Sequence, residues 1–230
     1  MVDNFITIGI TTPTSASSII EEAAIITEFL TPTVIKYVDQ NSSDHYSIRP
    51  IDFFHIRKPH VDSQYVKHLV SLIPEEYHKY LILHSHYNLL DDFKFGGIHI
   101  KPSDNTWRNI NFLSYPKKTF SRSCHEIKEL ETFRSEQIAY FFLSPIFNSI
   151  SKKDYFSSFS LADPSLLYLT RKFKIIALGG VKPELFHKLF DAKFVGAALL
   201  GYIWSPKITI KEKRDSLIME KIKIKNLSIL

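Results

Sequence analysis

Short apolar runs recur along the chain, and most of them precede a segment whose apolar residues follow helical spacing. The runs predict eight buried strands, which lie at residues 5–10, 51–59, 80–83, 96–100, 120–123, 140–144, 174–181 and 193–200. Helical spacing is found over residues 19–30, 61–72, 161–171 and 183–189. This alternation is typical of an α/β fold, a single (β/α)8 TIM barrel, with a doubly wound open sheet as the alternative.

Two stretches fall outside this alternation. Residues 31–50 contain two prolines and many polar side chains, and a run over 34–38 fits either a strand or an irregular segment, so we predict an irregular insertion. Residues 207–230 are rich in lysine and predict a solvated helix or tail. The barrel itself is therefore expected as one domain over residues 1–206.

Composition narrows the class of partner. The chain has 230 residues, 44% hydrophobic content and a formal charge of +5, and its lysines are spread out rather than gathered into one basic, aromatic-rich block. We therefore expect a small anionic ligand and no nucleic acid. The single cysteine, Cys124, excludes an intrachain disulfide and is expected to be a packed, inert thiol in a reducing compartment. No apolar run approaches the length of a membrane span and no signal peptide is evident, which predicts a cytoplasmic protein.

A pair of glycines ends the seventh apolar run. Gly179 and Gly180 lack a Cβ, so their backbone N–H groups can approach an anion, and a helix is predicted directly after them. In a barrel, the loops after strands seven and eight commonly hold a phosphate, and Gly201 ends the eighth run. The alternative is a turn that simply requires a positive φ angle.

Cations and hydroxyls follow two other strands. Arg57 and Lys58 end the second run and are candidate anion ligands, although a solvent-exposed pair would give the same pattern. After the sixth run, Ser149, Ser151 and Lys152 offer hydroxyl and ammonium donors that suit phosphate oxygens.

Histidines supply the candidate acid–base and metal chemistry. His84 and His86, two apart after the third run, could face one side and bind a metal or be polar loop residues. His125 lies within Ser123-x-x-Glu126, which has the spacing of a capping box, so we expect it in the first turn of a helix at the mouth of the barrel. There it could move protons near neutral pH or serve only as a capping-region residue.

Five motifs, in this order, resemble the thiamine phosphate synthase/TenI family. They lie at residues 54–57 (FHIR), 97–100 (GIHI), 122–125 (RSCH), 144–152 (SPIFNSISK) and 176–181 (IALGGV). The resemblance covers residues 53–204 and implies a thiamine-biosynthesis enzyme that joins hydroxyethylthiazole phosphate to hydroxymethylpyrimidine pyrophosphate. In such synthases pyrophosphate leaves with the assistance of Mg²⁺ and the thiazole nitrogen attacks the resulting cation.

The resemblance also implies roles for individual positions. Arg57 would hold pyrophosphate, and Asp104 would bind Mg²⁺. The substrate phosphates would contact residues of two groups, which are Ser149, Ser151 and Lys152, and Gly179, Gly180 and Gly201. His84-Ser85 stands where the synthases carry an Asn-Asp pair, and Lys58 lies one place off the register of a family lysine, so an altered metal and pyrophosphate site is expected.

Two other activities stay open. In the TenI branch, a thiazole tautomerase moves a proton on a thiazole carboxylate phosphate, and His125 matches its acid–base histidine. A barrel that binds a thiazole phosphate without turnover would keep the glycine turn and lose the reaction site. The partners implied in all cases are phosphorylated small molecules, with no nucleic acid and no membrane. The resemblance leaves open whether the protein forms a homodimer.

Overall fold

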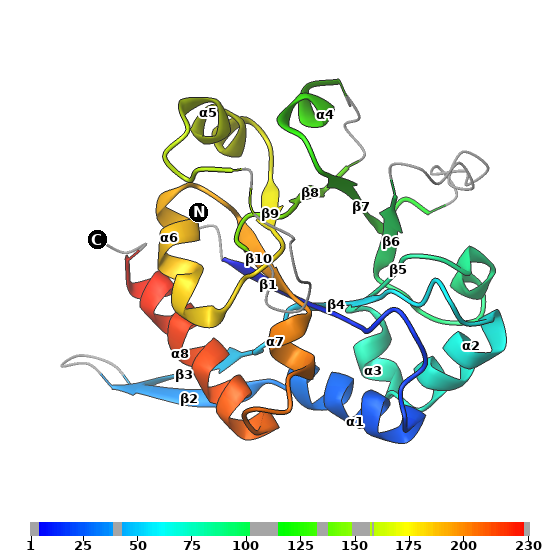
Figure 1. The fold of residues 1–230 in the computed structure, drawn as a ribbon. Coiled ribbons are helices and arrows are strands. Elements are labelled where there is room, and N and C mark those ends of the chain that lie inside the picture. Colours follow the sequence, from blue (N-terminus) through cyan, green and yellow to red (C-terminus); the bar gives the residue numbers. More distant parts are fainter. Residues whose placement is uncertain are drawn as a thin grey trace.

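A computed structural model describes residues 5–38, 43–101, 115–132, 138–148, 157 and 159–227. Eight parallel strands close into a barrel (Figure 1), and each overlaps one of the predicted apolar runs. They are β1 (Ile6–Ile10), β4 (Phe53–Ile56), β5 (Leu81–Leu83), β6 (Gly97–Ile100), β7 (Thr119–Cys124), β8 (Tyr140–Leu143), β9 (Ile175–Ala177) and β10 (Gly196–Leu199). Because β1 pairs with both β4 and β10, the sheet is closed, which confirms the barrel and excludes the open sheet.

Helices follow the strands on the outside of the barrel (Figure 1). The described α-helices are α1 (Ile19–Leu30), α2 (Ser63–Ser71), α3 (Glu75–His78), α4 (Ile127–Thr132), α5 (Pro164–Lys172), α6 (Phe186–Asp191), α7 (Gly201–Trp204) and α8 (Ile210–Leu227), with short 3-10 helices η1 (Tyr87–Leu90) and η4 (Pro183–Leu185). α1 begins as predicted, because the Ser18 hydroxyl accepts a hydrogen bond from the backbone N–H of Glu21 at 3.2 Å.

The capping box predicted at Ser123 and Glu126 is wrong. Ser123 lies in β7, and α4 begins only at Ile127. The carboxylate of Glu129 instead accepts hydrogen bonds from the backbone N–H groups of His125, at 2.6 Å, and Glu126, at 3.3 Å. His125 therefore precedes the helix rather than lying in its first turn.

The segment over residues 31–50 is not irregular. It contains β2 (Thr33–Val38) and β3 (Ser43–Ile48), which pair antiparallel as a ribbon outside the barrel and beside α8 (Figure 1). β-Branched and aromatic residues favour these strands in spite of the flanking prolines. The Arg214 guanidinium of α8 ties the ribbon down by donating to the Thr33 hydroxyl at 3.1 Å.

The lysine-rich segment 207–230 contains α8, and two of its lysines are not solvated. The ammonium of Lys221 contacts both carboxylate oxygens of Asp52, at 2.7 and 2.8 Å, and the Thr7 hydroxyl at 3.1 Å. Lys213 is buried and donates to the backbone carbonyls of Ile203 and Ser205. The last helix is thus fixed to the barrel by buried polar contacts as well as by its apolar residues.

Alternation along the strands divides the core in two. Side chains that point outward from the barrel pack under the helices, as Phe54 and Leu143 do. A separate apolar cluster fills part of the interior, and its buried members are Ile8, Ile10, Tyr140, Phe142, Ile176 and Ala198. These residues come from β1, β8, β9 and β10, so the interior of the other four strands is filled differently.

Candidate functional site

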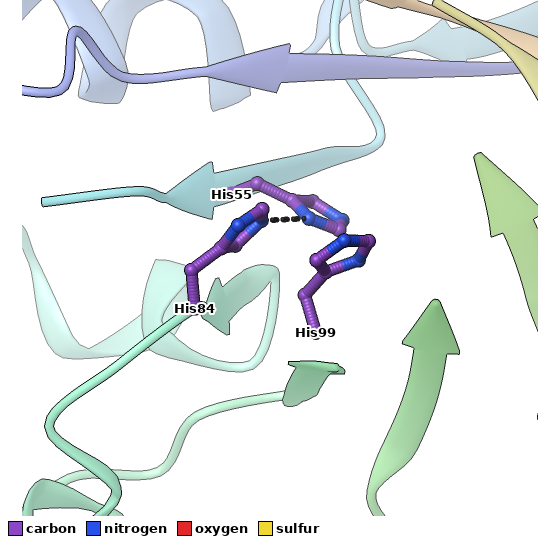
Figure 2. A group of neighbouring side chains, drawn as sticks. All are labelled: His55, His84 and His99. Carbon is purple, nitrogen blue, oxygen red and sulfur yellow. Dashed lines mark hydrogen bonds between the residues drawn. The ribbon is translucent and has the colours of Figure 1, made fainter. Parts of the chain in front are cut away.

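Three histidines lie inside the barrel on the side of β4, β5 and β6. His55 belongs to β4, His84 follows β5 directly and His99 belongs to β6. Their side chains meet (Figure 2), and all three residues are buried, with exposed fractions of 0% for His55, 3% for His84 and 1% for His99. Residues two apart on a strand face the same side, so His55 points inward because Phe54 and Ile56 pack outward. We call these three residues the histidine cluster.

The rings of the cluster are in direct contact. His55 Nδ1 and His84 Nε2 share a hydrogen bond of 2.8 Å (Figure 2), and the His84 and His99 rings stack with centroids 4.1 Å apart. One nitrogen from each of the three rings lies within 4.8 Å of one from each of the others. Three potential metal ligands therefore converge from three neighbouring strand positions.

Hydroxyl groups orient two of the rings. The Tyr140 hydroxyl lies 2.8 Å from His55 Nε2, the Ser121 hydroxyl 2.9 Å from His99 Nδ1 and the Ser123 hydroxyl 2.7 Å from His99 Nε2. Each hydroxyl can donate or accept, so these contacts suit either tautomer of a neutral ring.

Burial keeps the cluster neutral. It holds the pKa of His55 and of His84 well below the usual histidine value and that of His99 at about 3. Positive charge adds to this effect, because Lys101 and Arg57 also lower the pKa of His99. Each of the three imidazoles consequently keeps one unprotonated ring nitrogen at neutral pH.

Arg57 and Lys58 follow β4, but only Arg57 remains open to a ligand. Lys58 is fully buried, and its ammonium lies 2.7 Å from the Glu22 carboxylate and 2.6 Å from the carbonyl of Thr14. The predicted anion-binding role of Lys58 is therefore not supported, because the buried carboxylate of Glu22 already neutralises its charge. Arg57 is half-buried, and its backbone N–H is held by the Thr11 hydroxyl at 2.8 Å.

His125 lies at the carboxyl end of β7 and is exposed. Its Nδ1 is 3.3 Å from both the carbonyl and the hydroxyl oxygen of Ser144, which follows β8. The ring is therefore directed towards the neighbouring loop, and both contacts are long for hydrogen bonds. Cys124 beside it is buried, and burial raises the pKa of its thiol to about 12, so it stays protonated.

The glycine pair follows β9 and packs against the loop after β8. Gly179 and Gly180 have φ angles of 93° and 66°, where side chains are strained. A Cβ on Gly180 would lie 2.2 Å from the carbonyl oxygen of Asn148, and one on Gly179 would lie 2.9 Å from Pro145. The two loops therefore approach so closely that only glycine fits. Gly201 begins α7 after β10, next to this turn in the barrel order.

Four predicted site residues, Asp104, Ser149, Ser151 and Lys152, lie outside the described residues. The structure brings Arg57, His125, Gly179, Gly180 and Gly201 to the carboxyl ends of the strands, where TIM barrels carry their active sites. His84 also follows the end of its strand, β5, but its ring is buried and points into the interior (Figure 2). His86 takes no part in the cluster, and its backbone has a left-handed conformation with φ of 58°.

The residues at the end of β5 do not fit Mg²⁺. This ion prefers oxygen ligands in nearly octahedral geometry. His84-Ser85 stands where the resemblance implies an Asn-Asp pair, so no carboxylate follows β5 directly, and the His84 ring shares a hydrogen bond with His55.

Comparisons with known proteins agree with this architecture. The sequence profile described as thiamine monophosphate synthase matches residues 46–203. The thiamine-phosphate synthase of Latilactobacillus sakei subsp. sakei (strain 23K) is 25% identical over 146 residues, which span 63% of this chain and 65% of that protein. Less than two thirds of that relative is therefore matched.

Two solved structures cover nearly the whole chain. Thiamine phosphate pyrophosphorylase from Bacteroides thetaiotaomicron has a TM-score of 0.66 and 25% identity, over 97% of this chain and 98% of that one. The enzyme of the same name from Pyrococcus furiosus has a TM-score of 0.68 at 10% identity, with the same coverage, and shows the shared fold. No described helix is long and apolar enough to cross a membrane. The profile matches well over half of the chain, and the protein belongs to the thiamine monophosphate synthase family.

Proposed function

We propose that this protein is a thiamine phosphate synthase-type transferase that binds a phosphorylated thiazole at the mouth of the barrel. The observation that carries this proposal is the turn at Gly179 and Gly180, which presents backbone at the end of β9 in a conformation that needs glycine. A backbone cradle of this kind suits phosphate oxygens. Gly201, at the end of the adjacent strand β10, would complete the cradle.

The second substrate would be hydroxymethylpyrimidine pyrophosphate. The bond between its methylene carbon and pyrophosphate breaks, the electron pair leaves with pyrophosphate, and the thiazole nitrogen forms the new bond to carbon. Arg57, half-buried at the end of β4, is the described cation suited to the leaving pyrophosphate. Lys152, Ser149 and Ser151 are proposed to contact the same phosphates, and Asp104 to contact a metal ion.

Pyrophosphate release from the two substrates in the presence of Mg²⁺ tests the proposal. Arg57→Gln should lower kcat/KM by about 100-fold or more, because a charge-assisted contact to the leaving group is lost. Arg171→Gln, an exposed arginine at the end of α5, is the matched control and should leave the rate unchanged. Absence of turnover by the folded wild-type protein at saturating substrates would contradict the transferase.

A tautomerase is the second candidate, and the position of His125 favours it. Its ring is exposed at the mouth, has only 3.3 Å contacts to Ser144, and could take up and return a proton. In that case no pyrophosphate site is needed, which agrees with the engagement of Lys58 by Glu22.

Proton exchange on a thiazole carboxylate phosphate, followed in D₂O, distinguishes this candidate. His125→Ala should abolish the exchange, whereas His187→Ala, an exposed histidine on α6, should not. Exchange that survives in His125→Ala would exclude the tautomerase. Binding of thiazole phosphate without either reaction would instead support a barrel that acts only as a binder.

A further inference from the structure

We propose that His55, His84 and His99 form a binding site for a zinc-type divalent cation, with the fourth coordination position left for an anionic oxygen. The site lies inside the barrel, and its three residues take no part in the turn at Gly179 and Gly180. It differs from a magnesium site in its ligands, because imidazole nitrogen suits zinc, cobalt, nickel and copper, whereas Mg²⁺ takes oxygen.

The spacing of the rings is close to that of a bound metal. Zinc binds imidazole nitrogen at about 2.0–2.1 Å, so two tetrahedral ligand nitrogens lie roughly 3.3 Å apart. His55 Nδ1 and His84 Nε2 are 2.8 Å apart and need to separate by only about half an ångström. The third ring already lies within 4.8 Å, stacked against His84. For three nitrogens to surround one ion, the His99 ring would turn out of this stack and its nitrogen would move closer to the other two.

The surrounding hydroxyls can hold the tautomers that such a site needs. A histidine that ligates through one nitrogen usually donates its other N–H to an oxygen. Tyr140 can accept from Nε2–H of His55, which leaves Nδ1 unprotonated, and Ser121 can accept from Nδ1–H of His99, which leaves Nε2 unprotonated. The ion would take the place of the contacts that these two nitrogens make with His84 and with the Ser123 hydroxyl. The proton between His55 and His84 moves to the other nitrogen of its ring, so metal binding needs no net loss of a proton.

The local charge defines the fourth ligand. The three imidazoles are neutral, and Arg57, Lys101 and Arg122 contribute positive charge around His99. A divalent cation in this surrounding gains most when an anion binds with it. The fourth ligand is therefore an anionic oxygen, of hydroxide or of a phosphate, and cation and anion should bind cooperatively.

Titration of the chelator-treated full-length protein with Co²⁺ and Zn²⁺ tests the site directly. One equivalent of Co²⁺ should produce the visible d–d absorption of a four-coordinate site, and Zn²⁺ should displace it with a Kd of about 1 µM or below. Inorganic phosphate should shift the cobalt spectrum. A tenfold excess of Mg²⁺ should not displace the cobalt.

Variants separate this cluster from a local histidine pair. His84→Gln and His99→Gln should each weaken Co²⁺ binding by about 100-fold or more, and Tyr140→Phe, which removes an orienting hydroxyl, by about tenfold. His86→Ala is the matched control, because His86 is two residues from His84 but outside the cluster, and it should bind as tightly as wild type. Circular dichroism establishes that each variant is folded.

Failure of the folded wild-type protein to bind either ion at 1:1 stoichiometry would overturn the site, as would unweakened binding in a folded His99→Gln variant. Where a histidine variant does not fold, X-ray absorption of the zinc-loaded wild-type protein decides the matter. Three imidazole ligands support the site, and fewer overturn it. These measurements need no turnover, so they are independent of the proposed transferase activity.

Discussion

The two halves of the barrel interior are built from opposite chemistry. β1, β8, β9 and β10 contribute mainly aliphatic and aromatic side chains, whereas β4 to β7 contribute the histidine cluster and the hydroxyls of Ser121 and Ser123. The apolar half is stabilised by close packing alone, since hydrophobic contacts are not directional. The polar half must satisfy every buried nitrogen and oxygen, so it can exist only where each ring has partners. Within one barrel interior, the apolar half thus contributes packing stability and the polar half contributes the groups that could bind a ligand.

The largest effect on stability is expected from removing a large side chain of the apolar half where it borders the histidine cluster. Phe142 is 1% exposed, and its ring lies 4.8 Å from that of His99 and 4.9 Å from that of His55, centroid to centroid. Phe142→Ala should lower the free energy of unfolding by about 3–5 kcal/mol, because it removes a buried ring and leaves a cavity. Urea denaturation measures this loss. A loss below about 1 kcal/mol would mean that this half is not a packed core.

Acid should destabilise the polar half specifically. In the unfolded chain histidines take up protons below about pH 6.5, whereas the folded cluster resists protonation, in the case of His99 until about pH 3. The unfolded state therefore binds more protons between these values, and stability should fall as the pH drops through this window. The slope should approach about 1.4 kcal/mol per pH unit for each histidine that stays neutral.

Denaturation at pH 7.5 and at pH 5.5 provides the measurement. A His99→Gln variant should show a shallower dependence, since one of the three groups is removed. Equal pH dependence in the variant and the wild-type protein would show that the cluster is already protonated or exposed.

A smaller effect is expected from removing one hydroxyl. Ser121 is fully buried and lies 2.9 Å from His99 Nδ1. Ser121→Ala should cost about 1–3 kcal/mol in unfolding free energy, because a buried ring nitrogen loses its partner. Ser160→Ala, at an exposed serine before α5, is a control and should cost less than about 0.5 kcal/mol. A similar cost for both would remove the distinction between the two halves.

The strands and the barrel could be predicted from the sequence because each apolar run is local and the runs alternate with helical segments. The glycine turn was equally local, since Gly179 and Gly180 follow a strand directly. The ribbon over residues 31–50 was missed because its flanking prolines obscured two short strands. Capping by Glu129 was missed because Ser123 and Glu126 have the spacing of a capping box. Ser123 instead belongs to β7, α4 begins at Ile127, and Glu129 accepts the hydrogen bond from the backbone of His125.

The histidine cluster could not be assembled from the sequence alone. Its members lie 29 and 15 residues apart along the chain, and only strand register and barrel closure bring them together. A signal was nevertheless present, because His55 and His99 each stand between two apolar residues of a strand whose side chains face outward. The ion pair of Lys58 could not be predicted either, since nothing in its segment indicates Glu22 of α1 as its partner.

The hydrogen bond between Lys221 of α8 and Thr7 of β1 has a consequence for synthesis on the ribosome. Lys221 contacts Thr7 across 214 residues, and β1 pairs with β10 near the end of the chain. During elongation one edge of β1 has no partner strand until β10 has emerged, and α8 follows later still. The nascent chain therefore carries an unclosed sheet until β10 has been synthesised, and α8 can cover this junction only after that.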